Sequence, residues 1–220
     1  MSGGYPEHAL LPGDAELMQQ FGVSRTVLRE ALRTLAGKRL IEARARVGTR
    51  VLARSEWNLF DRDLLTWQSL QGFDAQFIAH LTEMRLALEP EAAALAATRR
   101  TNAELEAIFH CFDRMAVPDI GREDFAKADL DFHLAIVVAS QNPFLRSAAA
   151  LVEVALMGLL KVSSPAEDVA RLVSSVNDHR RIADGIAARD PEAAREAMKV
   201  VIAVGMRASR IGELANPGGH

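Results

Sequence analysis

Residues 23–35 read Val-Ser-Arg-Thr-Val-Leu-Arg-Glu-Ala-Leu-Arg-Thr-Leu and predict an amphipathic helix that decides the fold of the N-terminal part. Ser24 is a favourable N-cap residue, because its hydroxyl can accept a hydrogen bond from a free amide of the first turn. Apolar residues recur at spacings of three and four and therefore share one helix face: Val27, Leu28, Ala31, Leu32 and Leu35. Arginines spaced four residues apart form a row on another face: Arg25, Arg29 and Arg33.

A shorter apolar stripe precedes this helix and consists of Leu17, Met18 and Phe21, followed by Gly22 as a turn residue. A helix, a tight turn and a second helix with a basic outward face form the helix-turn-helix pattern, whose second helix enters the major groove of DNA. From these residues alone, an ordinary helical hairpin with a solvated arginine face explains the pattern equally well.

Two short strands are predicted directly after the helix, at residues 40–45 and 49–52. Gly48 lies in the connection between them and can adopt a positive φ. A basic hairpin after a recognition helix is a wing, and its arginines can reach phosphates or the minor groove: Arg44, Arg46 and Arg50. The wing favours a winged helix-turn-helix (α+β) over an ordinary hairpin.

At this point the chain resembles the GntR family of bacterial repressors. The resemblance depends on Leu11-Pro12, Glu16-Leu17, Gly22-Val23-Ser24-Arg25, Leu28-Arg29-Glu30-Ala31-Leu32, Leu35 and Gly48-Thr49. It implies a DNA-binding domain at residues 1–54 that contacts double-stranded operator DNA. The residues expected to face DNA are Ser24, Arg25, Thr26, Arg29, Arg33, Arg46, Gly48 and Thr49.

Two features depart from this family. Related repressors usually place a full helix before a Gly-x-Tyr turn, whereas this sequence starts at the turn, so we expect the first helix to be missing, through truncation or a misassigned start. His8 occupies a position where the family commonly has glycine. Both departures bear on the stability of the winged domain.

Charge is divided unevenly along the chain, which has a formal net charge of −3. Residues 1–54 contain nine Arg and Lys against five Asp and Glu, a net charge of +4, and the remainder contains seventeen against twenty-four, a net charge of −7. A basic small domain joined to an acidic larger one suits a DNA reader attached to a different module. The single cysteine, Cys111, fits a reducing compartment, and no apolar run or signal peptide suggests a membrane, so we expect a cytoplasmic, nucleoid-associated bacterial protein.

An all-α antiparallel bundle is predicted at residues 61–214, after a linker at residues 55–60 and before a disordered tail at residues 215–220. A capping box opens the helix after Thr101, and Pro90 should kink or divide the helix in which it lies. The expected helices span residues 61–69, 74–99, 123–141, 143–160, 165–189 and 191–212, with a further helix that opens at residue 101.

Three polar residues lie on inward helix faces of this bundle, namely Asp129, His133 and His179. A carboxylate and an imidazole one turn apart, facing a second imidazole, can bind a divalent transition metal and leave positions open for water or a ligand. The residues alone also allow a hydrogen-bonded Asp129–His133 pair, with His179 an unrelated core histidine.

The bundle resembles the FCD ligand-binding domain of the FadR-type branch of the GntR family. The matching motifs are Glu83-Met-Arg85, Leu88-Glu89-Pro90, Asp129-x-x-Phe132-His133, Asn142-Pro143 and Asp178-His179-Arg180, with Ile182, Ile186 and Asp190. The resemblance implies that Asp129, His133 and His179 bind a metal, with zinc expected first and nickel or manganese as alternatives. The family's fourth ligand, a histidine on the last helix, falls on Val201 here, so at most three protein ligands remain.

Arg85 is expected to bind the effector, because a planar guanidinium matches a carboxylate and the family has an effector-binding arginine here. The alternative is a surface ion pair of Arg85 with Glu83 or Glu89. The stretch at residues 57–67, Trp-Asn-Leu-Phe-Asp-x-Asp-x-Leu-x-Trp, is similar to the galactonate-responsive branch of the family and implies a sugar-acid effector, an aldonate.

The sequence therefore predicts a homodimeric repressor that leaves its operator when a sugar acid or another small carboxylate binds at a metal site. A helical-bundle metalloenzyme is the competing class, but the paired Glu-x-x-His motifs of such enzymes and any nucleophile–base pair are missing from the sequence. Two further alternatives are a regulator whose bundle site is purely structural and a plain DNA-architectural protein.

Overall fold

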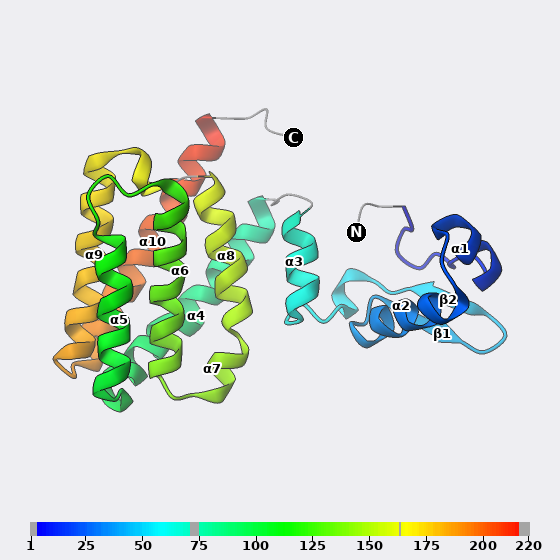
Figure 1. The fold of residues 1–220 in the computed structure, drawn as a ribbon, viewed down its shortest axis with the longest axis horizontal. Coiled ribbons are helices and arrows are strands. Elements are labelled where there is room, and N and C mark those ends of the chain that lie inside the picture. Colours follow the sequence, from blue (N-terminus) through cyan, green and yellow to red (C-terminus); the bar gives the residue numbers. More distant parts are fainter. Residues whose placement is uncertain (1–3, 71–74, 163, 216–220) are drawn as a thin grey trace. The chain divides into compact units, whose positions relative to one another are not determined.

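The computed structural model describes residues 4–70, 75–162 and 164–215, which fall into two compact units, Met1–Gly72 and Phe73–His220 (Figure 1). The first unit contains α1 (Asp14–Phe21), α2 (Arg25–Gly37), β1 (Ile41–Arg44), β2 (Gly48–Val51), the 3-10 turn η1 (Arg54–Glu56) and α3 (Arg62–Leu70). The second contains α4 (Ala75–Arg99), α5 (Asn102–Met115), α6 (Arg122–Ala139), α7 (Pro143–Ser147), α8 (Ala149–Val162), the 3-10 turn η2 (Pro165–Glu167), α9 (Val169–Ala187) and α10 (Pro191–Ala215).

The helix-turn-helix consists of α1 and α2. Gly22 ends α1 in the left-handed conformation, at a φ of 64°, and its amide donates to the carbonyl of Met18. Ser24 then opens α2, where its hydroxyl accepts a hydrogen bond from the amide of Val27 at 3.4 Å. Leu17 and Leu28 are buried between the helices. The predicted helix-turn-helix is thereby confirmed.

The predicted wing is also present, as the antiparallel pair β1 and β2, with Ile41 opposite Val51 and Arg44 opposite Gly48. Positive φ values occur at Arg46, in the middle of the connecting loop, and at Gly48, the first residue of β2, at 64° and 113°. Only glycine adopts such a conformation without steric cost, so Gly48 suits this corner and Arg46 is strained there.

The segment before α1 pairs with the free edge of β2. The amide of Leu11 donates to the carbonyl of Thr49 at 2.8 Å, and the amide of His8 donates to the carbonyl of Val51 at 3.0 Å. His8 has a φ of 66°, in the left-handed region. This conformation gives a physical reason for glycine at this position in related repressors, because a side chain there costs free energy.

Helix α3 belongs to the winged unit, whereas the sequence had placed its residues in the bundle. Leu64 of α3 is fully buried against Leu40 and Ile41. The Nζ atom of Lys38 lies 2.7 Å from Asp61 Oδ1 and 2.8 Å from Asp63 Oδ2. These contacts attach α3 to the end of α2, so the boundary between the units follows α3 rather than preceding it.

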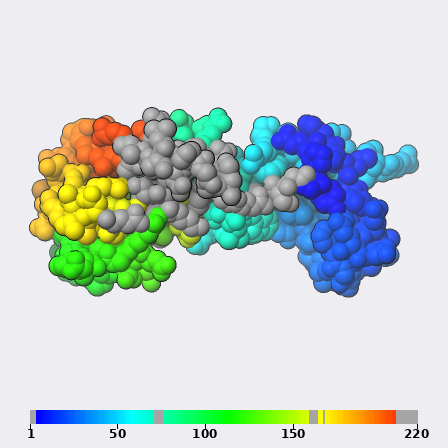
Figure 2. All heavy atoms as spheres, turned by 90° about the horizontal axis from the view of Figure 1, so that it is seen from above, coloured from blue at the N-terminus to red at the C-terminus, as the bar shows by residue number. Residues whose placement is uncertain are grey.

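The second unit is the predicted antiparallel helical bundle. In Figure 1, α5, α6 and α8 lie in front of α4 and α10, and α9 packs beside α5 and α10. In the space-filling view the residues of α9 lie directly beside those of α5 (Figure 2). Alanines of α4 line the buried core and allow α10 to approach closely: Ala92, Ala93, Ala96 and Ala97.

Several helix boundaries differ from the expected ones. Pro90 does not divide α4, because contacts with α6, α8, α9 and α10 support the helix despite the missing amide donor. The helix expected at residues 143–160 is two helices, α7 and α8, separated at Ala148. Asp168 begins α9 by accepting from the amide of Arg171 at 3.0 Å, three residues after the expected start at Pro165.

The capping box at Thr101 is confirmed, since its hydroxyl and the Glu104 carboxylate each accept from the other's backbone amide. The tail expected to be disordered lies outside the described residues, apart from Ala215 at the end of α10. Among the described helices, none has the length and apolar character needed to span a bilayer.

Candidate metal centre and effector cavity

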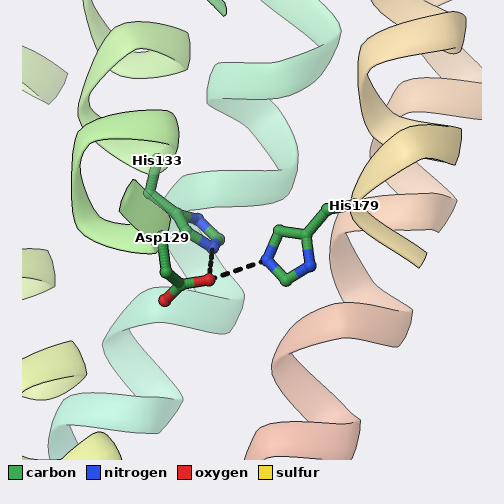
Figure 3. Close-up of side chains that lie close together, drawn as sticks. All are labelled: Asp129, His133 and His179. Carbon is green, nitrogen blue, oxygen red and sulfur yellow. Dashed lines mark ion pairs between the residues drawn. The ribbon is translucent and has the colours of Figure 1, made fainter. Parts of the chain in front are cut away.

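Two helices of the bundle bring the three predicted ligands together (Figure 3). Asp129 and His133 lie one turn apart on α6, and His179 faces them from α9. Asp129 Oδ1 is 2.9 Å from His179 Nε2 and 3.9 Å from His133 Nε2. The three residues are buried, and each offers one ligand atom within 4.8 Å of the others.

The second nitrogen of each imidazole faces a partner outside this cluster. His133 Nδ1 lies 2.5 Å from Glu89 Oε2, and His179 Nδ1 lies 2.7 Å from the carbonyl oxygen of Ser175. Partners of this kind hold a metal-binding histidine in the tautomer that leaves Nε2 free.

Both Nε2 atoms and also His133 Nδ1 are buried without a hydrogen-bond partner of satisfactory geometry among the described residues. Buried polar atoms are normally satisfied, so three unsatisfied imidazole nitrogens beside carboxylates require an explanation. The donor set of two imidazoles and one carboxylate fits a divalent transition metal, and an open coordination position would remain.

Burial and charge act in opposite directions on this cluster. Burial alone would raise the pKa of Asp129, but contact with His179 and the charges of His133 and Arg85 lower it below its ordinary value. Burial alone would lower the pKa of His179, but contact with Asp129 raises it above its ordinary value. The lowered pKa of Asp129 favours its ionised form, and a metal bound here would have to displace any proton shared by Asp129 and His179.

Arg85 and Glu89 form a buried ion pair on α4 beside the cluster. Arg85 Nε lies 2.5 Å from Glu89 Oε1, and Arg85 Nη2 lies 3.3 Å from Glu89 Oε2. Burial would raise the pKa of Glu89, but the charges of Arg85 and His133 outweigh it and lower the pKa to about 2. The surface ion pair considered for Arg85 is thus a buried one, and Arg85 also lines the cavity next to the metal cluster.

Glu89 is the site residue that sequence reasoning missed. It was expected as part of a family motif and as a possible surface partner of Arg85, whereas it contacts both Arg85 and His133. The available signal was the four-residue spacing of Arg85 and Glu89 on one helix, which places both side chains on one face.

A cavity of about 150 Å³ opens beside the three ligands. Its walls come from α4, α6, α8, η2, α9 and α10, and they comprise Arg85, Phe125, Asp129, His133, Leu156, Pro165, Arg171, Ser174, Ser175, Asp178, His179, Val201, Val204 and Gly205. Val201 lines the wall where the family's fourth ligand would stand, so this side is apolar. The volume suits a compact ligand, since cavities for drug-sized molecules are several times larger.

The residues expected to face DNA lie in the other unit. Ser24, Arg25, Thr26 and Arg29 are exposed around the N-terminal part of α2. Arg33 is exposed one turn further along, where its Nη1 lies 3.3 Å from Glu30. The wing residues Arg46 and Gly48 are exposed, and Thr49 is half-buried. The structure thus leaves the expected contact residues open on α2 and the wing.

A winged helix-turn-helix joined to a helical bundle with a buried polar cluster defines a class of two-domain transcriptional regulators. Residues 1–51 match the bacterial regulatory proteins of the gntR family, and residues 80–203 match the FCD domain. The chain therefore belongs to the GntR family, in the branch with an FCD domain, and is a transcriptional regulator rather than an enzyme.

Relatives of similar length support this assignment. The chain is 36% identical over 204 residues to the uncharacterized HTH-type transcriptional regulator YieP of Escherichia coli (strain K12), covering 92% of this chain and 86% of the relative. It is 32% identical over 205 residues to the galactonate operon transcriptional repressor of the same organism, covering 93% and 89%.

Solved structures show the same fold. A GntR protein of Streptococcus agalactiae has a TM-score of 0.51 at 26% identity, covering 92% of this chain and 91% of that protein. Lar of Listeria monocytogenes has a TM-score of 0.63 at 19% identity, covering 95% and 90%, and this likeness concerns the fold alone.

Proposed function

We propose that this regulator is a repressor and that a small sugar acid, an aldonate of the galactonate kind, releases it from its operator. Asp129, His133 and His179 would hold one divalent metal, zinc first and nickel or manganese as alternatives. The observation that carries the proposal is the pair of buried, unsatisfied Nε2 atoms beside Asp129 Oδ1, at the wall of a cavity that Arg85 also lines.

The charges in the cavity favour a carboxylate ligand. Arg85 is buried, and its guanidinium can meet a carboxylate in a planar fork. A bound metal would supply a second positive centre with open positions for the carboxylate and a hydroxyl of the ligand. Because Val201 offers no fourth donor, a metal bound here would depend more on oxygen atoms of the effector than a metal held by four protein ligands does.

The similarity to the galactonate operon transcriptional repressor supports an aldonate as the effector class. A repressor that responds to a metabolite acts on chromosomal DNA, so we place the protein in the bacterial cytoplasm. Effector binding in the bundle would change how the winged units of a homodimer meet the two half-sites of an operator.

The metal and effector can be tested together. We expect purified protein to contain about one zinc per chain, and chelation to weaken galactonate binding in calorimetry. His133→Ala and His179→Ala should lose the metal, whereas His110→Ala, at an exposed position of α5, should keep it. Metal-free wild-type protein whose galactonate affinity is unaffected by both substitutions would show that the cluster is a structural part of the core.

The DNA contacts are proposed from the exposed residues of α2 and the wing, and a separate experiment tests them. If Arg29 reads a guanine, Arg29→Ala should cost about 1–3 kcal/mol of operator binding and relax specificity at one position. The exposed Arg181 of α9 provides a matched control outside the winged unit. Equal weakening on all DNA sequences would make Arg29 a phosphate contact, and a shallower salt dependence would accompany it.

A further inference from the structure

Helix α9 presents a polar stripe to the cavity. Arg171, Ser174, Ser175 and Asp178 line the cavity at spacings of three and four residues, which is one face of the helix. Arg171 and Ser174 are exposed at the rim of the cavity, whereas Ser175 and Asp178 are half-buried, so polar groups extend from the rim into the bundle. The stripe continues directly into the metal cluster, because His179 follows Asp178 and lies four residues after Ser175.

The wall contributed by α10 has the opposite character. Val201, Val204 and Gly205 also follow helical spacing, and they offer only apolar or small surfaces. Helices α9 and α10 pack against each other, so the cavity has one polar and one apolar side. A ligand that fits it carries polar groups along one side of its length.

Asp178 places a carboxylate in the wall of the cavity that Arg85 also lines, where we propose that the carboxylate of the effector binds. Only 15% of its side chain is exposed, and its Oδ1 accepts a hydrogen bond from Arg181 Nη1 at 3.2 Å. Arg181 is itself 70% exposed, so this pair is solvated and holds Asp178 weakly. A carboxylate repels an anion but accepts hydrogen bonds from hydroxyl groups, often from two at once.

We propose that Asp178, together with the Ser174 hydroxyl one turn before it, binds the distal hydroxyl groups of the ligand and selects a sugar acid over a short hydroxy acid. This inference rests on the proposed function. Arg85 and the three metal ligands fix the carboxylate end, and the Asp178 stripe then distinguishes a polyhydroxylated chain from lactate or glycolate. A second carboxylate at the far end is disfavoured by the charge of Asp178.

The test compares two acids on two variants of the metal-loaded, full-length protein by calorimetry. Asp178→Asn preserves the size of the side chain and removes its charge, and Asp184→Asn changes an exposed carboxylate of α9 that is away from the cavity. Wild type should bind D-galactonate more tightly than L-lactate. Asp178→Asn should weaken galactonate binding by about tenfold or more and leave lactate binding unchanged, because hydrogen bonds to a charged acceptor are lost only with the sugar acid.

Other outcomes overturn the inference in separate ways. Equal losses for both acids, or a lower zinc content in Asp178→Asn, would make Asp178 a positioning residue for His179. No loss for either acid, or tighter binding of the dicarboxylate galactarate than of galactonate, would also contradict it. If wild type binds galactonate but Asp178→Asn weakens that binding no more than Asp184→Asn does, the inference alone fails, whereas binding of lactate without galactonate would contradict the proposed aldonate effector as well. If no carboxylate binds wild type or releases it from DNA, the proposed function fails as well.

Discussion

Glu89 connects Arg85 to the Asp129–His133–His179 cluster through two side-chain contacts, with Arg85 and with His133 Nδ1. Glu89→Gln keeps the shape but removes the charge that orients His133. Loss of such an outer partner typically lowers metal affinity by about 10–100-fold, and we expect a loss of this size for zinc. Competition with a chelator dye measures it.

Glu91→Gln is the matched control, because Glu91 lies on the same helix but pairs with Arg195 at a partly exposed position. Glu89→Gln should also lower the free energy of unfolding, since the buried guanidinium of Arg85 loses its counter-charge. Equal zinc affinity in the two variants would show that Glu89 serves Arg85 alone.

His8 stands where the family commonly has glycine, and its backbone conformation costs free energy. Its φ of 66° is left-handed, and its side chain is exposed. His8→Gly should therefore stabilise the winged unit by about 1 kcal/mol, while the hydrogen bond of its amide to Val51 is kept. His8→Ala keeps the strain and should bring no gain. Urea unfolding followed by tryptophan fluorescence reports this unit selectively, because both tryptophans, Trp57 and Trp67, lie in it.

The grouping of Asp129, His133 and His179 could be predicted at the residue scale, and the contact of Glu89 with His133 could not. Asp129 and His133 share a face of one helix, and His179 interrupts an apolar stripe, so helical spacing alone marks all three as inward polar residues. Glu89 acts on His133 only because α4 packs beside α6. Residue spacing along the sequence cannot predict that contact, because it forms only when α4 and α6 pack together.

At the scale of elements, Lys38 attaches α3 to the recognition helix α2. Its side chain is 10% exposed and contacts Asp61 and Asp63, and it lies 5.4 Å from the ring of Trp67. Asp61 also caps α3 by accepting from the amide of Leu64 at 3.0 Å. We expect Lys38→Met to lower the stability of the winged unit by about 1–3 kcal/mol in tryptophan-detected unfolding.

Asp61 and Asp63 should differ in how much they contribute to the stability of the winged unit. Asp61 is 23% exposed and Asp63 is 65% exposed, so Asp61→Asn should cost clearly more than Asp63→Asn. Burial raises the pKa of Asp61, but Lys38 and the Leu64 amide outweigh it and lower the pKa below 3.8. The contribution of Asp61 is therefore full above its ordinary pKa and is lost as the pH falls through the lowered value. The difference between wild type and Asp61→Asn should shrink below about pH 4, and a difference that is constant from pH 7 to pH 2 would contradict this assignment.

The position of α3 shows that the packing partner of a helix could not be predicted from the sequence. Its helical character followed from the sequence, but its partner did not, because Leu64 and Leu65 suit any apolar neighbour. Pro90 shows the same limit, since a proline predicts a break only where tertiary contacts do not support the helix. The division of α7 from α8 likewise depends on how each packs.

For the whole molecule, the order of the two units followed from motifs and charge, since a basic winged unit precedes an acidic bundle.

Homodimerisation is the remaining prediction at this scale. A winged unit reads one half-site, and a two-fold axis between two copies matches a palindromic operator. Sedimentation velocity at micromolar concentration should therefore give a dimer, and one dimer should bind one palindrome.

The DNA itself supplies the control for this prediction. A duplex with one half-site should bind far more weakly than the palindrome, because linking the two winged units makes the second contact intramolecular. Inserting half a helical turn between the half-sites should abolish this advantage, since the second site then faces away from its winged unit. A monomer both with and without DNA, together with equal affinity for the three duplexes, would show that each chain reads DNA alone, and effector release would then have to act within one chain.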